Sequence, residues 1–549
     1  MTVTEAPRDA AVEAAAAPSL SAPPTGLAAV VGSGDPRTIG KLFVGTSLLF
    51  LIASGVAGAL VGFEQYDSAG SEIFGADTAV RVFTLHSTAA LFLGVLPLLL
   101  GLATVVVPLQ VGSSTVAFPR ATAAAYWVWL VAGGLVLASY AIDGGPFGTE
   151  LDAVGLYVAG LTAVVVALAV ATVSVVTTVA TLRAPGMSLR RTPLFSWSVL
   201  VGGSVWLLTL PVLAGMLLLA FVDLRYGQQQ FMGGSAGVYD RVAWMFWQPT
   251  LYVVAVPALG IIADVVPVFA RRRHQRHRTA MFLLGAAAAL GFGAWAQLGA
   301  SVDGSTASAP WLFELPWIAV GFAAIVPVLG LLGLWTATLF AGKIRFGTPL
   351  VLSLFAGLLL FVGIAAGGAT VIDALDLDGT TWMTAQATLV LLGSLLAGLA
   401  GVSFWAPKLY GKLLPDGATR LGGTLVFLGA LLAAVPQAVA GLLSQGRFVA
   451  GGVAAVDGGD LDTVELLDLL SAVGLAVVVL GGLVVALTLA KRRSGEGPGD
   501  DPWDGHTLEW TTASPPAVGH FATVPEITSE APLYDARHAA AAASTEASA

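Results

Sequence analysis

The chain has 549 residues, of which 56% are hydrophobic and only 11% are charged, and its mean hydropathy is +0.84. Soluble domains carry about 25% charged residues, so this composition excludes both an ordinary globular protein and a disordered one. The absence of cysteine excludes disulfides, thiolate metal sites, iron–sulfur clusters and covalently attached haem. The net charge of −9 does not favour nucleic acid as a partner.

Three regions follow in chain order. Residues 1–36 are rich in Ala and Pro and contain no long apolar run, which predicts a disordered tail rather than a signal peptide. Residues 37–490 form a membrane domain. Residues 491–549 form a tail, and its last dozen residues, rich in Ala and Ser, are expected to be disordered.

The membrane domain contains repeated apolar runs that are each far longer than the ~9–11 residues a barrel strand needs, which predicts helices. Twelve spans are expected, at residues 39–61, 82–107, 122–141, 152–181, 197–221, 243–267, 279–300, 316–340, 348–371, 382–406, 420–443 and 463–490. The fold class expected is therefore an all-α polytopic membrane bundle.

The basic residues orient these spans. With the N-terminus in the cytoplasm, the inner segments hold 21 of the 25 Lys and Arg residues and the outer segments hold four. The positive-inside rule then places both termini in the cytoplasm. The outer loops are acidic, as at Glu64, Asp143 and Asp376. Solvated loops explain this charge best, and a basic partner at the outer face is the alternative.

The middle of the spans is almost free of ionisable residues, with His86 as the exception. Asp264 lies near an inner end, and Glu465 and Asp468 lie near an outer end. Proton pumps and ion-coupled transporters need a carboxylate or lysine at mid-depth, so the sequence argues against both.

Several motifs occur in a fixed order along the chain: 183–200 (RAPGMSLRRTPLFSWSVL), 210–215 (LPVLAG), 343–349 (KIRFGTP), 404–409 (FWAPKL), 501–503 (DPW), 507–511 (TLEWT) and 514–516 (SPP). With these motifs the chain resembles subunit I of the haem–copper oxidases, the cytochrome c and quinol oxidase family, over about 36–535. The resemblance implies a twelve-helix bundle in a bacterial plasma membrane.

The family's chemistry uses six histidines: two on a low-spin haem, one on a high-spin haem and three on copper. Thr84–Thr88 match the motif around one low-spin haem ligand, so the resemblance implies that His86 is retained. The other five ligand positions hold Gln248, Gln297, Leu298, Gln386 and Thr388. Among them, Gln386 stands for the high-spin haem ligand and Thr388 for the second low-spin ligand.

Other functional positions implied by the resemblance are also changed. Tyr252 is kept from the oxygen site, but Thr250 stands where the family has a glutamate. Leu331 and Thr115 replace a lysine and an aspartate of the proton inputs. One arginine of the propionate-binding pair remains, Arg447. Metals, proton inputs and propionate anchors are lost together, which is typical of a relinquished activity.

Two interpretations remain open at the retained positions. His86 is either a haem axial ligand or an inherited neutral histidine that bonds a hydroxyl such as Ser87 or a backbone carbonyl. The inherited neutral histidine is the favoured interpretation. The replacing glutamines form either a polar network with Tyr252 and Thr250 or a small-ligand pocket, and again the network is favoured. Glutamine is a poor copper ligand, so copper is not expected. The basic run 271–278 is interpreted as a topology signal, not a lipid or metal site.

The sequence therefore predicts a cytochrome c oxidase subunit I-like pseudoenzyme without cofactors. It would act as a structural, assembly or partner-binding component of a respiratory or redox membrane complex, with the lipid bilayer and other membrane subunits as partners. One alternative is a divergent terminal oxidase or single-haem electron-transfer protein that uses His86, with Arg447 as a propionate contact. Another is a small-ligand transporter through the former active-site cavity.

Overall fold

The structure is a computed structural model that describes residues 26–66, 74–227, 236–291, 311–447, 461–491, 497, 499–517, 519, 521 and 526–547. In these residues the chain is helical, and the only strand-like pairing is an isolated bridge between Thr380 and Gly446. The membrane bundle consists of α3 (Pro36–Tyr66), α4 (Ala76–Thr88), the π-helix η1 (Ala89–Val95), α5 (Leu96–Val111), α6 (Pro119–Ala141), α7 (Leu151–Thr181), α8 (Leu194–Tyr226), α9 (Ala236–Phe269), α10 (His277–Leu290), α11 (Trp311–Phe322), α12 (Ile325–Phe340), α13 (Thr348–Ala369), α14 (Thr381–Phe404), α16 (Asp416–Leu442) and α17 (Leu461–Ala490).

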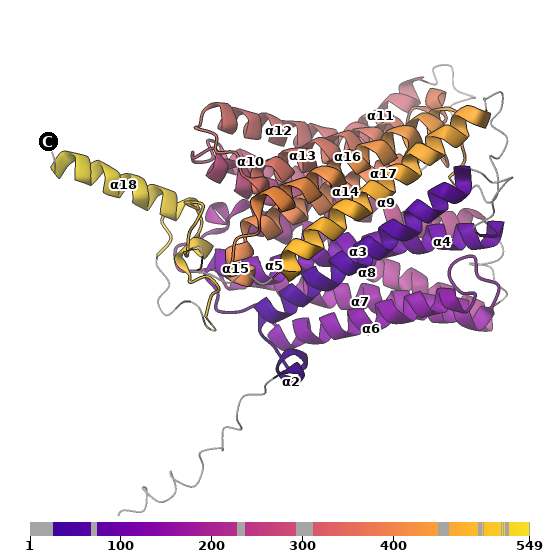
Figure 1. Ribbon diagram of the computed structural model, residues 1–549, viewed down its shortest axis with the longest axis horizontal. Coiled ribbons are helices and arrows are strands. Elements are labelled where there is room, and N and C mark those ends of the chain that lie inside the picture. The colour runs from indigo at the N-terminus through magenta and orange to yellow at the C-terminus, as the bar shows by residue number, and fades with distance from the viewer. Residues whose placement is uncertain are drawn as a thin grey trace, which may run out of the picture.

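Shorter elements lie outside the long helices: α2 (Leu27–Val31), η2 (Leu189–Arg191), η5 (Asp373–Leu375), α15 (Ala406–Tyr410), η6 (Leu508–Thr511) and α18 (Pro532–Ala547). Figure 1 shows the long helices side by side in one bundle, with α2 and α18 at the same end of it. The expected all-α membrane fold is confirmed.

Eleven helices among the described residues are long and apolar enough to cross a membrane. The expected span 279–300, the seventh in chain order, is described only as α10 up to Leu290 and Gly291, because residues 292–310 lie outside the described chain. The expected span 316–340 corresponds to Ile318–Phe340, in which a turn at residues 323–324 separates α11 from α12. The helices also extend past the predicted edges: α3 covers Pro36–Tyr66 where 39–61 was predicted.

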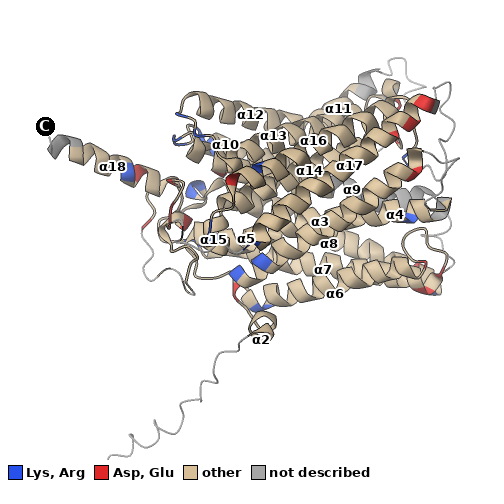
Figure 2. Ribbon diagram, viewed as in Figure 1, with Lys and Arg blue, Asp and Glu red and all other residues tan. Residues whose placement is uncertain are grey.

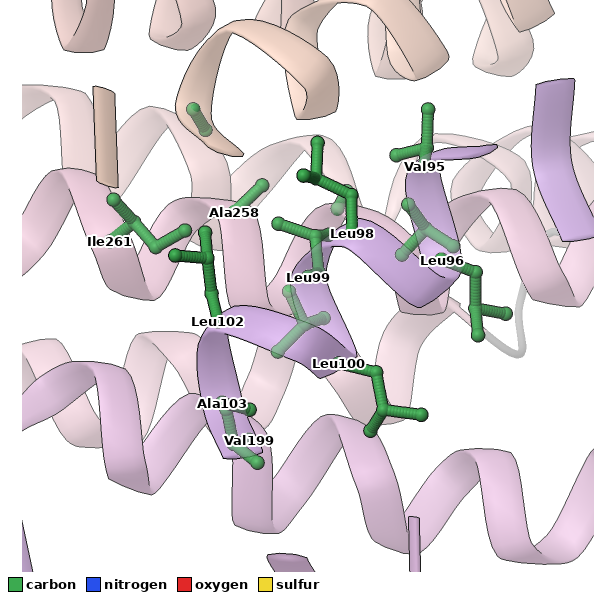
Figure 3. Packing of buried hydrophobic residues seen from close by; sticks show 14 of the residues in the cluster. Val95, Leu96, Leu98, Leu99, Leu100, Leu102, Ala103, Val199, Ala258 and Ile261 are labelled. Carbon is green, nitrogen blue, oxygen red and sulfur yellow. The ribbon is translucent and has the colours of Figure 1, made fainter. Parts of the chain in front are cut away.

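The second span lies at the centre of the bundle. Every residue of α5 is buried, and all except Thr104 and Gln110 are apolar, so apolar residues cover all sides of this helix rather than one stripe. Leu98, Leu99 and Leu102 of α5 lie beside Ala258 and Ile261 of α9 (Figure 3). The π-helix η1 precedes α5, and the indole Nε1 of Trp129 in α6 donates a hydrogen bond of 3.0 Å to the carbonyl of Phe92 within it.

Charge divides the bundle into two ends (Figure 2). We call the end that carries Arg183, Lys343 and Lys408 the basic end, and the end that carries Glu64 and Asp143 the acidic end. The two ends match the inner and outer segments assigned from the sequence. A polytopic helical protein needs such segregation to have one orientation in a bilayer.

Two terminal predictions can be compared with the structure. Residues 1–25 of the expected N-terminal tail lie outside the described chain, and Leu27–Val31 form one helical turn. The prediction that the last dozen residues are disordered is wrong as far as Ala547, because α18 extends from Pro532 to that residue. Alanine has the highest intrinsic helix propensity, so a run of Ala continues a helix that packed residues have started.

Candidate functional site

His86 near the end of α4 is held by α3. Its Nδ1 lies 2.6 Å from the carbonyl oxygen of Ser54, and the Ser54 hydroxyl donates to the carbonyl of His86 at 2.8 Å. A backbone carbonyl only accepts, so Nδ1 carries the proton and Nε2 keeps its lone pair. Metal-bound histidines use this tautomer and this kind of outer hydrogen bond.

Gly58 lets the ring approach α3 closely. A Cβ at Gly58 would lie 2.6–2.9 Å from three atoms of the His86 ring, closer than real contacts allow. The hydroxyl of Ser87, one of the two kinds of partner expected from the sequence, bonds the carbonyls of Phe83 and Thr84 instead. The tautomer of His86 therefore leaves Nε2 unprotonated, which an axial bond to a haem iron would require.

The position expected for the second axial ligand does not fit that role. Thr388 in α14 donates its hydroxyl to Oε1 of Gln437 in α16 at 3.2 Å. A threonine hydroxyl and an amide oxygen are hard and weak iron ligands compared with imidazole, so they do not complete a bis-imidazole low-spin haem site.

The position expected for the high-spin haem ligand is bonded to the retained tyrosine. Gln386 of α14 donates Nε2 to Oη of Tyr252 in α9 at 3.3 Å, and the two side chains are 1% and 3% exposed. Gly367 of α13 faces this pair: a Cβ there would lie 2.2 Å from Tyr252 Oη and 2.4 Å from Gln386 Nε2. Three helices thus meet around an amide–phenol pair, which does not suit haem iron or copper.

Of the remaining predicted positions, two are described by the structure and three lie outside the described residues wholly or in their side chains. Thr250 is buried in α9. The side chain of Gln248, and both Gln297 and Leu298, lie outside the described residues. Arg447 is at the acidic end, where its backbone N–H donates to the carbonyl of Gly379 at 2.8 Å. In the part of the chain that the structure describes, no three His, Asp or Glu residues are grouped to hold a metal ion.

Gly367→Ala is expected to destabilise the protein by about 1–3 kcal/mol, because the added methyl group forces Tyr252 and Gln386 apart. The measurement is denaturant unfolding of the purified chain. Gly333→Ala is the matched control, since a Cβ there meets nothing within 4 Å and alanine favours a helix. Equal stability of the two variants would contradict the close packing at the Tyr252–Gln386 pair.

Sequence reasoning missed a buried polar network at the basic end. Gln110 of α5 donates Nε2 to Asp264 Oδ2 at 2.8 Å and to Glu509 Oε1 at 3.2 Å, and it accepts from the Ser196 hydroxyl at 2.7 Å. Trp405 donates to the same Glu509 oxygen at 3.1 Å. Glu509 is 0% exposed, and burial raises its pKa.

The sequence signal for this network was available in the tail. Leu508 and Trp510 flank Glu509, and both side chains are buried. An apolar residue on each side of a carboxylate, in an otherwise polar tail, indicates a segment that packs onto the body of the protein. The network brings η6 of the tail to α5 and α9, so the tail is part of the folded structure.

Comparison with known proteins agrees with this fold and these motifs. Residues 38–477 match the family "Cytochrome C and Quinol oxidase polypeptide I". A Streptomyces avermitilis protein named as a cytochrome c oxidase subunit 1-beta is 31% identical over 92% of this chain and 91% of its own length. Cytochrome c oxidase subunit 1 of Bacillus subtilis is 28% identical over 91% of this chain and 82% of its own length.

A solved structure has the same fold. It is the cryo-EM structure of a haem–copper terminal oxidase dimer, with a TM-score of 0.64 over 84% of this chain and 85% of that chain, at 14% sequence identity. The match over 38–477 covers most of the membrane domain. The chain is therefore a multi-pass membrane protein of the cytochrome c and quinol oxidase subunit I family.

Proposed function

We propose that this protein is a non-catalytic member of its family, a structural, assembly or partner-binding component of a respiratory or redox membrane complex. In this proposal it lies in the bacterial plasma membrane with both termini in the cytoplasm, and other membrane subunits pack on its lipid-facing surface. The acidic end is then the outer face.

The observation that carries the proposal is the Gln386–Tyr252 hydrogen bond. The sequence motifs imply that Gln386 stands at the position of the iron ligand of the oxygen site, and this side chain is buried and hydrogen-bonded to Tyr252. An amide cannot replace imidazole as a strong axial ligand. The scaffold around the pair keeps its apolar packing, as in α5 and α9. Retained packing without ligands supports a role for the scaffold itself.

The test is haem and metal analysis of the full chain purified in detergent, by pyridine haemochrome assay and elemental analysis. The proposal expects neither stoichiometric haem nor copper, and no oxygen consumption with reduced cytochrome c or a quinol. Two haems with copper, or measurable oxidase activity, would overturn it.

A single-haem electron-transfer protein is the second candidate, and the Nδ1 bond of His86 to the Ser54 carbonyl favours it. That bond keeps Nε2 available, and one haem would supply one-electron chemistry there. This candidate expects one haem per chain that is lost in His86→Ala. Ser87→Ala is the matched control, because the Ser87 hydroxyl bonds only nearby carbonyls of its own helix.

A further inference from the structure

The basic run 271–278 has two faces. Arg271, Arg272, Arg276 and Arg278 are exposed, whereas His274 and His277 are each 8% exposed and point into the protein. Arg273 is partly buried and forms ion pairs with Glu530 and Asp535 of the C-terminal tail. A topology signal explains the exposed arginines, but it does not explain two buried histidines.

A small cavity lies between this run and the tail. Its volume is about 30 Å³, and its lining includes Asp264 of α9, His274 and His277, and His506, Thr507 and Glu530 of the tail. One water occupies about 10–15 Å³ in this measure, so the cavity holds about two waters. His506 is 6% exposed, so all three histidines of the lining are buried. We call His274, His277 and His506 the histidine cluster.

Several ring nitrogens in the cluster have no protein partner. Neither Nδ1 nor Nε2 of His274 is hydrogen-bonded within the described residues, and the same is true of Nε2 of His277. A neutral imidazole here can bond to cavity water, but a charged one has too few acceptors. Burial is the main cause that lowers the pKa of each: to about 4 for His274, to about 3 for His506, and also below its usual value for His277.

The groups around the cluster decide the sign of its response. His274 and His277 repel each other's proton, Arg273 and Arg278 face His277, and Arg537 and His538 face His506. Glu530 and Asp264 are the opposing carboxylates. Glu530 is bonded to Arg273, and Asp264 accepts from Gln110 and from the backbone of Leu194 and Phe195, so both are engaged.

The tail is fastened to the body next to the cluster. Arg191 donates to the carbonyl of Ile527 at 2.9 Å, and the Ile527 N–H donates to the carbonyl of Pro185 at 3.0 Å. Ile527 is 1% exposed. Residues 526–538 therefore form a latch that covers one side of the cavity, where Glu530 and Ala531 line it beside the histidine cluster.

We propose that the histidine cluster is a proton-binding site that opens this latch when the surrounding solution becomes acidic. Protonation places positive charge in a buried cavity that already faces Arg273, Arg278 and Arg537, and exposure to water relieves the cost. Folded-state pKa values below 6.5 mean that the latch is fully stable above pH 6.5. Below pH 6.5 and down to about pH 4, the equilibrium constant for closing the latch falls about tenfold per pH unit for each histidine. The pH response of the latch does not depend on whether the protein binds haem or copper.

The test uses the absence of native cysteine. Ala531→Cys places a thiol in the cavity lining at a residue that is 6% exposed, and Ala542→Cys places one on the exposed side of α18. The labelling rate of Ala531→Cys is divided by that of Ala542→Cys at each pH, which cancels the titration of the thiol. The full chain in detergent is measured at pH 7.5 and at pH 5.5.

The ratio is expected to rise at least tenfold from pH 7.5 to pH 5.5. His274→Gln and His506→Gln, each made in the Ala531→Cys chain, remove one proton site and should each reduce that rise about tenfold. Arg273→Gln, which breaks the ion pairs to the tail, should give a high ratio at both pH values and serves as the open reference. A constant ratio in the native-histidine chain, or an undiminished rise in both glutamine variants, would overturn the proposal.

Discussion

Lys408→Met is expected to lower the free energy of unfolding by about 3 kcal/mol and to loosen the tail at Asp500 and at residues 512–514. The Lys408 side chain is 0% exposed, and its Nζ donates to the carbonyls of Asp500 at 2.9 Å and Thr512 at 2.5 Å and to the Ser514 hydroxyl at 3.0 Å. Methionine keeps the length of the side chain but leaves these acceptors without a donor.

The measurement is denaturant unfolding followed by tryptophan fluorescence, because Trp510 lies 5.3 Å from the Lys408 ammonium. Lys412→Met is the matched control. Lys412 also donates to two carbonyls, those of Leu489 and Lys491, but it lies at the partly exposed rim. Its loss is expected to cost less than about 1 kcal/mol. Equal effects at the two positions would contradict the role given to Lys408.

Trp129→Ala is expected to destabilise the protein by about 3–5 kcal/mol. The indole of Trp129 is 0% exposed and packs against Phe43 and Tyr126, with ring centroids 5.2 and 5.9 Å away. The substitution leaves a cavity in α6 and removes the hydrogen bond to the carbonyl of Phe92 in the π-helix η1. Because η1 directly follows the turn that carries His86, loss of that bond also loosens the histidine's position.

Trp129→Phe is a milder change. It keeps one aromatic ring but removes the Nε1–H donor together with part of the indole, so we expect a smaller loss of about 1–3 kcal/mol. Trp127→Ala, at a partly buried neighbour whose Nε1 has no partner among the described residues, should cost less than Trp129→Ala. Thermal unfolding in the same detergent ranks the three variants. A larger loss in Trp127→Ala than in Trp129→Ala would contradict the packing described.

The sequence predicted the bundle well because a segment that crosses a bilayer must pair its backbone N–H and C=O groups within a helix. Such a helix needs a long apolar run, which is visible in the sequence. It predicted edges less well, because a helix such as α3 continues beyond the apolar run at both ends, Pro36–Tyr66 against 39–61. It placed Gln386 and Tyr252 at one site only through the resemblance, and their hydrogen bond depends on how α9 and α14 pack.

The parts that the sequence did not predict are contacts between distant residues at the basic end. Glu509 and Gln110 are 399 positions apart, and Arg273 and Glu530 are 257 positions apart. No local period indicates such pairs. His274 and His277 carried a weak signal, because with Ala280 they repeat every three residues and all three are buried. The arginines of the run 271–278 surround these histidines, so the three-residue repeat of buried positions is not apparent from the sequence.

The buried network at the basic end has a consequence for biogenesis. A ribosome releases α5, α9 and α14 well before Glu509, so Gln110 and Trp405 enter the bilayer without one of their partners. Water must form hydrogen bonds with these groups until the tail packs onto the bundle, because unpaired polar groups are costly in hydrocarbon. The basic end of the nascent bundle therefore stays hydrated through insertion. When η6 packs onto the bundle, Glu509 replaces this water. The last step in folding the membrane domain is therefore the packing of a segment that lies outside the membrane.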